Sequence, residues 1–443
     1  MKNNLVKRLC AVALAATMVL GMVGCGSSAS TTTESTTEEN TETDGSEEVV
    51  LNVWHQWAND TNELKGIYDA AVAAYMEEHP NVTINTETLD TEAYKTKISA
   101  EFAGDASGID VFYYWGAGTA KKLVDAGKLL SLDDYITEEV AAKILPGSTS
   151  AFEYDGSTYS LPSFSWYMAL FCNTALFEEA GVELPTTYDE LLAAVEALTE
   201  IGVTPIASGA KDGWNAAFVY QALAMREIGA DTINSMLSGE TAFAGDDGYR
   251  AAAEKMSELY ELGAFGANPL EGGNDDANAS FIAGNSAMRI MGSWFANQVY
   301  SDETVTINPE DVVAINIPMI NEDGDASDYC GGFIESFWVN NSTANPDVAA
   351  DFAIYINEKM GAAAYETGTG FSGWDVEMDD SNLNPLFIQI KELLAESETG
   401  VLAWDTSLDS YPATIHNEMV QTLFAPNADI DAFIEEHEMA INE

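Results

Sequence analysis

The chain has 443 residues, with 17 Lys plus Arg against 73 Asp plus Glu and a formal net charge of −56. This balance excludes nucleic acid as a partner, because binding a polyanion requires a basic face. It also argues against electrostatic docking on anionic lipid. Hydrophobic residues make up 47% of the chain, which suffices for a large packed core, and the length predicts two or three domains.

Residues 1–24 have the pattern of a signal peptide. Three cations in the first eight residues precede an apolar run over 9–23, which is too short to span a bilayer. The run ends in Met-Val-Gly before Cys25 and resembles the lipobox of bacterial lipoproteins, which implies cleavage before Cys25 and acylation of its thiol. An ordinary secretory signal is the alternative. Residues 25–48, rich in Ser, Thr and acids, predict a flexible tether.

Two cysteines remain in the part of the chain that can fold, Cys172 and Cys330. An extracellular compartment permits a disulfide between them. Two buried free thiols explain the sequence equally well.

Hydrophobic patterning predicts an α/β fold in the first third of the chain. Strands are expected at 49–53, 82–84 and 109–113, with a helix over 61–78 and another that ends near Gly127. This alternation of apolar strands with helices is typical of a covered, mainly parallel sheet. Ligands of such sheets lie beyond the carboxyl ends of the strands, where Trp54 and Trp115 stand.

A second α/β block begins near Thr158. Strands are expected at 167–171, within 281–292, and at 312–317 and 336–339. The helices are expected at 188–201, 216–228, 249–262, 345–359, 386–394 and 414–423.

Seven segments, in this order, resemble the extracellular solute-binding proteins of ABC importers, in the carbohydrate-binding branch that includes maltose-binding protein. Among them, LFEEAGVELPTTYDEL and FIAGNSAMRIMGSW match the family pattern over most positions. The segments lie at 53–54, 75–82, 104–112, 127–133, 159–173, 176–191 and 281–294.

This resemblance implies a two-lobed fold of the periplasmic-binding-protein type, in which discontinuous lobes are joined by hinge crossings. The first lobe is expected to comprise 49–156 and 310–362, and the second 157–309 and 363–443. The ligand would lie in the cleft between the lobes, and lobe closure would present it to the transmembrane subunits of the permease.

A sugar site needs flat aromatic faces under the C–H patches of the sugar and polar groups around its edge. Most of the nine Trp stand at expected loops or strand ends, whereas Trp338 lies in an apolar strand and is expected in the core. Since Trp is also a common core residue, each assignment competes with simple burial. The candidate ligand-binding Trp residues are Trp54, Trp115, Trp166, Trp214, Trp294, Trp374 and Trp404, of which Trp294 is favoured because the family stacks sugar there.

Carboxylates make charge-assisted hydrogen bonds to hydroxyls, although most acids of so acidic a chain must be solvated surface residues. A glycine allows backbone to approach a ligand closely or simply forms a turn. Besides the Trp residues, the candidate ligand-binding residues are His55, Asp212, Gly332, Glu335, Asp375 and Asp405.

The sequence contains no metal-ligand, nucleophile-elbow or phosphate-loop pattern, so neither an enzyme nor a bound cofactor or metal is expected. We expect a monomeric receptor, lipid-anchored at the extracellular face of a bacterial cytoplasmic membrane, that delivers a mono- or oligosaccharide to an ABC importer. The anchor would be its sole membrane contact. The alternatives are a polyamine or peptide ligand on the same scaffold, or a surface polysaccharide adhesin.

Overall fold

The computed structural model describes residues 47–59, 62–301, 303–322, 324–376 and 379–442. The predicted signal peptide, Cys25 and nearly all of the tether therefore lie outside the described residues. The chain from Glu47 to Glu443 forms one compact unit. Across the described ranges, no helix combines the length and apolar character needed to cross a bilayer.

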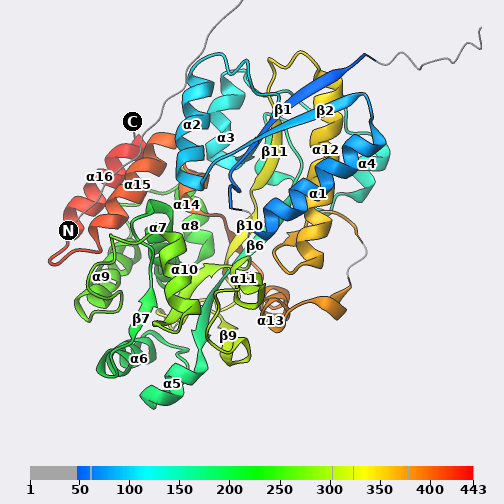
Figure 1. Cartoon of the computed structure of the whole chain (residues 1–443). Helices are drawn as coiled ribbons and strands as arrows, with labels where there is room; N and C mark the ends of the chain where they lie inside the picture. Colours follow the sequence, from blue (N-terminus) through cyan, green and yellow to red (C-terminus); the bar gives the residue numbers. More distant parts are fainter. Residues whose placement is uncertain (1–46, 60–61, 302, 323, 377–378, 443) are drawn as a thin grey trace, which may run out of the picture. The chain divides into compact units, whose positions relative to one another are not determined.

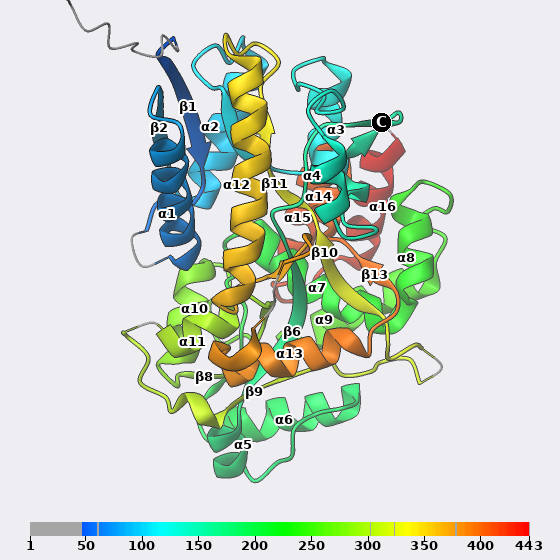
Figure 2. The ribbon, with the colours of Figure 1, turned by 90° about the vertical axis from the view of Figure 1, so that its right-hand side faces the viewer.

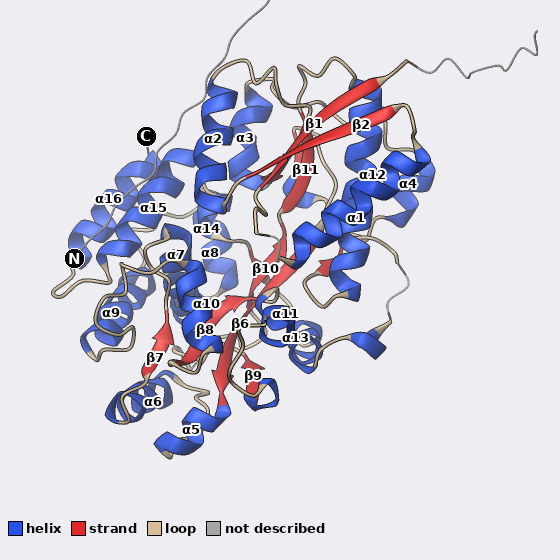
Figure 3. Cartoon of the chain, viewed as in Figure 1, coloured by secondary structure: helices blue, strands red, loops and turns tan. Residues whose placement is uncertain are grey.

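The first sheet has the strand order β11-β3-β1-β2 and confirms the mainly parallel sheet predicted for this region (Figures 1 and 3). β1 pairs parallel with both β2 and β3, and β11 adds an antiparallel edge through β3. Its buried hydrophobic runs explain why the sequence predicts these strands. The strands are β1 (Val49–His55), β2 (Val82–Thr88), β3 (Val111–Trp115) and β11 (Glu335–Val339).

Helices pack around this sheet, and two of them begin with a side-chain cap. Asn62 caps the first turn of α1 and Asp90 that of α2, each by accepting a backbone N–H. α12 packs along α1 and β11 (Figure 2). The helices are α1 (Glu63–Glu78), α2 (Thr91–Ala103), α3 (Ala117–Asp125), α4 (Glu138–Lys143) and α12 (Pro346–Glu366).

The second sheet is built around β6 (Phe164–Asn173), all ten residues of which are buried. β8, β9, β10 and β12 pair antiparallel with β6, β7 pairs parallel with β8, and β13 pairs parallel with β10. These strands are β7 (Thr204–Ala207), β8 (Ser286–Gly292), β9 (Val312–Ile315), β10 (Tyr329–Phe333), β12 (Phe371–Ser372) and β13 (Gly400–Val401). A separate hairpin joins β4 (Glu153–Tyr154) to β5 (Ser157–Thr158).

Helices also surround the second sheet, and α6 opens with a capping box between Thr187 and Glu190. The helices expected at 188–201, 216–228, 249–262, 386–394 and 414–423 are confirmed within a few residues. They are α5 (Thr174–Ala180), α6 (Tyr188–Glu200), α7 (Gly213–Ile228), α8 (Ala230–Leu237), α9 (Asp247–Glu261), α10 (Asn274–Ile282), α11 (Phe295–Ser301), α13 (Pro385–Ala395), α14 (Trp404–Ser407), α15 (Ser410–Thr422) and α16 (Ile430–Asn442).

One extended segment belongs to both sheets. β10 pairs with β6 and β11 pairs with β3, and only Ile334 separates them (Figure 2). Gly331 has φ +150° and lies so close to β6 that a Cβ would sit 2.2 Å from the Trp166 carbonyl oxygen. Only glycine fits there.

The lobe boundaries stay a prediction. Within the predicted first-lobe range 310–362, β9 and β10 are strands of the second sheet. Trp374, in the predicted second-lobe range, packs into the core of the first sheet.

Cys172 and Cys330 are both buried free thiols, so of the two possibilities left open by the sequence the structure has the unbridged one. Burial raises the pKa of the Cys330 thiol to about 12, and it raises that of Cys172 further above its usual range.

Candidate ligand-binding site

A pocket of about 200 Å³ lies between α2, β3 and α3 on one side and α14 and α15 on the other. It brings together two residues that the sequence predicts to bind ligand, Trp115 and Asp405. Its other polar lining includes Lys95 and Lys122 from the first side and Asn417 from the second. These last three residues are not predictable from the sequence, because a lone Lys or Asn on a helix carries no recognisable pattern.

The two sides of this pocket touch directly. The hydroxyl of Thr119 on α3 donates to the carbonyl oxygen of Thr406 on α14, at 3.1 Å. Next to this bond, Gly118 packs so closely on α14 that a Cβ would lie 2.3 Å from the Ser407 carbonyl oxygen. The close approach of α3 to α14 therefore brings the two sides of the pocket into direct contact.

Trp54 and Trp115 lie at the carboxyl ends of β1 and β3, where the sequence predicts them. Trp54 and Trp115 are each 8% exposed. Lys97 lies over the Trp54 ring at 4.3 Å from its centroid, and Lys95 over the Trp115 ring at 5.2 Å. Part of each indole face is therefore covered by a lysine of α2.

Glu335, another predicted ligand residue, pairs with Trp115 in the β11–β3 ladder and is half-buried. Burial raises the pKa of its carboxyl to about 7. The neighbouring Tyr113 and Trp115 side chains and the positive charge of Lys95 act in the opposite direction, more weakly. Near neutral pH this carboxyl can therefore either donate or accept a hydrogen bond.

Asp212 lies at the start of α7, where its carboxylate accepts the backbone N–H of Asn274 at 2.7 Å. The fully buried guanidinium of Arg289 holds the same region together by donating to the side-chain oxygens of Asn215, Asn274 and Asn278. It also donates to the backbone carbonyls of Ala207, the last residue of β7, and of Ser208, which follows it. Burial lowers the pKa of Arg289 to about 9. A lone cation in the apolar strand 286–292 was the signal that could have identified it.

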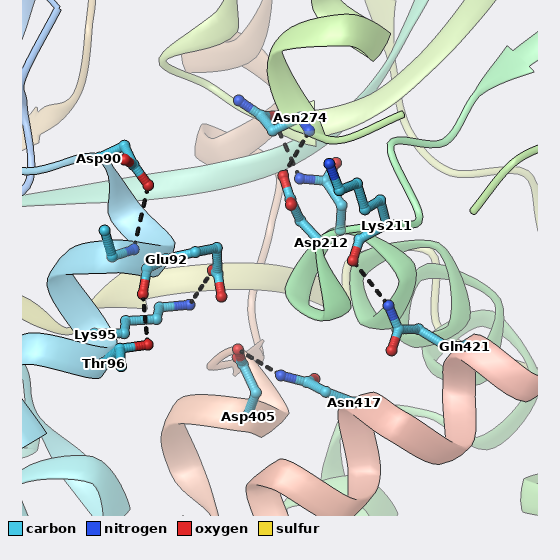
Figure 4. Close-up of polar contacts among 12 residues, drawn as sticks. Asp90, Glu92, Lys95, Thr96, Lys211, Asp212, Asn274, Asp405, Asn417 and Gln421 are labelled. Carbon is cyan, nitrogen blue, oxygen red and sulfur yellow. Dashed lines mark hydrogen bonds and ion pairs between the residues drawn. The ribbon is translucent and has the colours of Figure 1, made fainter. Parts of the chain in front are cut away.

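Asp212 and Asp405 lie on the same side of the site, from different helices. Asn417 donates to the Asp405 carboxylate at 3.5 Å, and its Cβ lies against Gly213, the residue after Asp212. Figure 4 shows this polar group opposite Glu92 and Lys95 of α2. Of these residues, Lys95 on one side and Asp405 and Asn417 on the other line the 200 Å³ pocket, which therefore has hydrogen-bonding groups on both sides.

Three tryptophans and one phenylalanine form an aromatic cluster on the second sheet: Trp166, Trp214, Phe218 and Trp294. Trp166 stacks on Phe218 with centroids 5.2 Å apart and meets Trp294 edge to face at 5.7 Å. Trp214 meets Phe218 edge to face at 5.3 Å. Trp166 is buried, whereas Trp214 and Trp294 are partly exposed.

The position of the Trp294 ring depends on Gly292. The indole lies over this glycine, so a Cβ there would sit 2.1 Å from a ring carbon. The Gly-Ser-Trp sequence thus allows the ring to fold back over the end of β8 and pack on Trp166.

Three predicted ligand residues lie in the core. His55, Trp374 and Trp404 have no exposed surface. The Nδ1 of His55 accepts the backbone N–H of Trp57, and the Trp374 indole donates to the carbonyl of Pro162. Their polar atoms are used, or enclosed, within the fold, and a ligand has no access to them in this conformation.

The last two predicted residues lie at the surface or at the bend between the sheets. Asp375 is exposed, and its backbone N–H donates to the carbonyl of Lys143. Gly332 pairs with Trp166 in the β10–β6 ladder, and the side chain of Leu402 lies against it. Neither residue lines the 200 Å³ pocket.

Comparison with known proteins gives a consistent result. The family model described as bacterial extracellular solute-binding protein matches residues 58–363. An uncharacterized ABC transporter extracellular-binding protein of Pyrococcus horikoshii is 26% identical over 349 residues, which cover 77% of this chain and 75% of the relative. A probable sugar-binding periplasmic protein of Rhizobium meliloti is 28% identical over 176 residues, or 38% of this chain and 40% of that protein.

Solved structures confirm the two-lobed α/β fold that the sequence predicts. A structure from a study of xylan utilization by the thermophilic bacterium Caldanaerobius polysaccharolyticus has a TM-score of 0.84 and 30% identity, covering 89% of this chain and 100% of the other. Maltose-bound MalE3 of T. maritima has a TM-score of 0.72 and 15% identity, covering 89% and 99%.

Proposed function

Because the chain belongs to the family of bacterial extracellular solute-binding proteins, which bind a small ligand and deliver it to the permease subunits of an ABC importer, we propose that its ligand is a mono- or oligosaccharide. The protein is a receptor of that import system, and no chemistry on the ligand is required of it. The saccharide is held at the 200 Å³ pocket and the adjoining aromatic cluster.

The aromatic cluster carries this proposal. Trp214 and Trp294 are partly exposed, and Asp212 lies two residues before Trp214. Asn417, which lines the pocket, packs on Gly213 between them. Indole faces complement the C–H patches of a pyranose ring, and carboxylates and amides complement its hydroxyls. A peptide or polyamine would not use this combination as fully.

Xylo-oligosaccharides are the first ligands to test, because the structure that is 30% identical comes from a study of xylan utilization. Thermal shift assays would compare xylo-oligosaccharides, malto-oligosaccharides, peptides and polyamines, since a ligand of the native state raises the unfolding midpoint by mass action. A polyamine or peptide as the sole stabilising class would overturn the carbohydrate assignment. An unchanged radius of gyration with bound saccharide would instead favour an adhesin that does not close.

Trp294 gives a residue-level test. Trp294→Ala should weaken saccharide binding by about 1.5 kcal/mol, roughly tenfold, the scale of a lost aromatic contact. Trp294→Phe keeps an aromatic face and should retain most of the affinity. Equal affinity of all three proteins in calorimetry would remove Trp294 from the site.

We also propose that residues 1–24 are removed and that the acylated Cys25 anchors the protein at the extracellular face of the cytoplasmic membrane. The support is the Met-Val-Gly-Cys sequence after an apolar run, followed by a polar tether. Cys25→Ser should release the protein from the membrane fraction into the medium. Release of the unaltered protein as well would favour the ordinary secretory signal.

A further inference from the structure

The 200 Å³ pocket continues into a second one. A pocket of about 240 Å³ lies between α2 and α3 and shares Ser99, Tyr114 and Lys122 with the first. Because they share these lining residues, the two pockets lie side by side and together form a groove that extends from the candidate ligand site between α2 and α3. Lys95, Lys122 and Lys128 line it, and we call it the lysine groove.

The charge of the lysine groove is opposite to that of the protein. Three of the 17 Lys and Arg residues of the chain line it, whereas Asp405 is its only lining carboxylate within the described part of the chain. A net charge of −56 repels anions from the surface in general. A local excess of lysines is therefore what an anionic group would need in order to bind here.

The lysines are only partly neutralised by neighbouring acids. Lys95 pairs with Glu92 at 3.4 Å, and Lys128 donates to the backbone carbonyl of Gly104 at 2.8 Å. The side chain of Lys122 makes neither an ion pair nor a hydrogen bond to any described residue, although its backbone carbonyl accepts the Ala126 N–H. Although the residue as a whole is exposed, desolvation by the neighbouring groove atoms lowers the pKa of its ammonium group, so an anion beside it would restore favourable interactions.

The rest of the groove indicates what kind of anion fits. The 240 Å³ pocket is lined by the apolar Phe102 and Leu123, the 200 Å³ pocket by Trp115 and several Ser and Thr residues, and both by Tyr114. Apolar and aromatic surface suits the C–H faces of a sugar ring better than it suits a compact inorganic ion. The groove therefore combines a surface for a ring with cations for a carboxylate.

We propose that the lysine groove binds a uronate unit, a carboxylate-bearing branch or end of the saccharide that occupies the main site. This inference rests on the proposed function and deepens it, because it assigns an acidic oligosaccharide as the preferred ligand. Lys122 and Lys95 hold the carboxylate by charge-assisted hydrogen bonds.

The test compares two probes in calorimetry: a xylo-oligosaccharide, and the same backbone with one glucuronate branch. The unaltered protein should bind the branched compound about tenfold more tightly, the usual scale of a charge-assisted bond. Lys122→Gln should abolish that preference, because its affinity for the branched compound should fall about tenfold more than its affinity for the neutral compound. Lys121→Gln is the matched control, because the adjacent Lys121 lines neither pocket and pairs with Asp125 at 2.6 Å.

The outcomes separate the two proposals. Equal affinity for both probes, or an equal loss for both in Lys122→Gln, would overturn the uronate site and leave the neutral saccharide site standing. Binding of neither probe would overturn both proposals for xylan-derived ligands. Lys95→Gln serves as a second variant, and the preference should also decline as salt is raised, since screening weakens the ion pair.

Discussion

Arg289→Met tests whether one buried cation organises the loops of the candidate site. Arg289 is fully buried in β8, and no carboxylate is hydrogen-bonded to it within the described chain. Five hydrogen bonds to amide and carbonyl oxygens compensate for its burial. Met has a similar length and fills the space, but it donates nothing.

The magnitude follows from the acceptors that lose their donor. Two backbone carbonyls and the side-chain oxygens of Asn215 and Asn278 are buried, and each unsatisfied buried acceptor costs about 1–3 kcal/mol. Removing a buried charge that has no hydrogen-bonded carboxylate, although Asp212 attracts it from nearby, offsets part of this cost. We expect a net loss of about 3 kcal/mol in the free energy of unfolding.

Urea denaturation followed by circular dichroism measures this loss, with Arg250→Met as the control. Arg250 pairs with Asp431 at the surface, where an ion pair contributes less than about 1 kcal/mol. Arg289→Met should also weaken ligand binding, because Asn274 holds the Asp212 carboxylate. A loss no larger than that of Arg250→Met would refute the assigned role.

Two further predictions concern stability in acid and the contact between α3 and α14. His416 and His437 lie 4.8 Å apart in the core, and burial lowers the pKa of His437 to about 3 and that of His416 well below 6.5. Because the folded protein holds both imidazoles neutral, their contribution to stability is fully present above pH 6.5 and is lost as the pH falls toward 3. His416→Phe should therefore flatten the decline in the free energy of unfolding, measured with urea, between pH 7 and 4.5. An unchanged slope would contradict this prediction. Gly118→Ala forces a Cβ against the Ser407 carbonyl and should reduce ligand affinity. Gly66→Ala is the control, because open space surrounds Gly66 and the affinity of this variant should not change. Equal affinities of the two variants in calorimetry would show that the contact between α3 and α14 does not contribute to ligand binding.

Most strands and long helices could be predicted because each carries its own signal. β1 and β3 are short apolar runs, and α6 has a capping box followed by regular hydrophobic spacing. The sequence does not predict α2, because only three of its thirteen residues are buried. Tyr94 and Phe102 are two of these three and lie on one narrow stripe of the helix. A narrow stripe in a polar segment is hard to distinguish from a loop.

The site was harder to predict because it is assembled from distant segments. Lys95 and Asn417 line one pocket from positions far apart in the chain, and neither lies in a motif. Trp374 and Trp404 are predicted to bind the ligand because an acidic residue follows each of them in the sequence. Their rings instead fill the core, and a large apolar ring gains more from full burial than from partial exposure.

The shared segment β10–β11 has a mechanical consequence. The two sheets are joined through Ile334, so a change in the angle between them must be absorbed by the backbone torsions on either side of it. Gly331 and Gly332 supply that freedom on one side, and they are hydrogen-bonded to the strand that carries Trp166. On the other side stands Glu335, next to Trp115. Twisting this strand would therefore move an indole in each half of the protein at once, which makes the spacing between the two rings a direct gauge of how far the halves have turned.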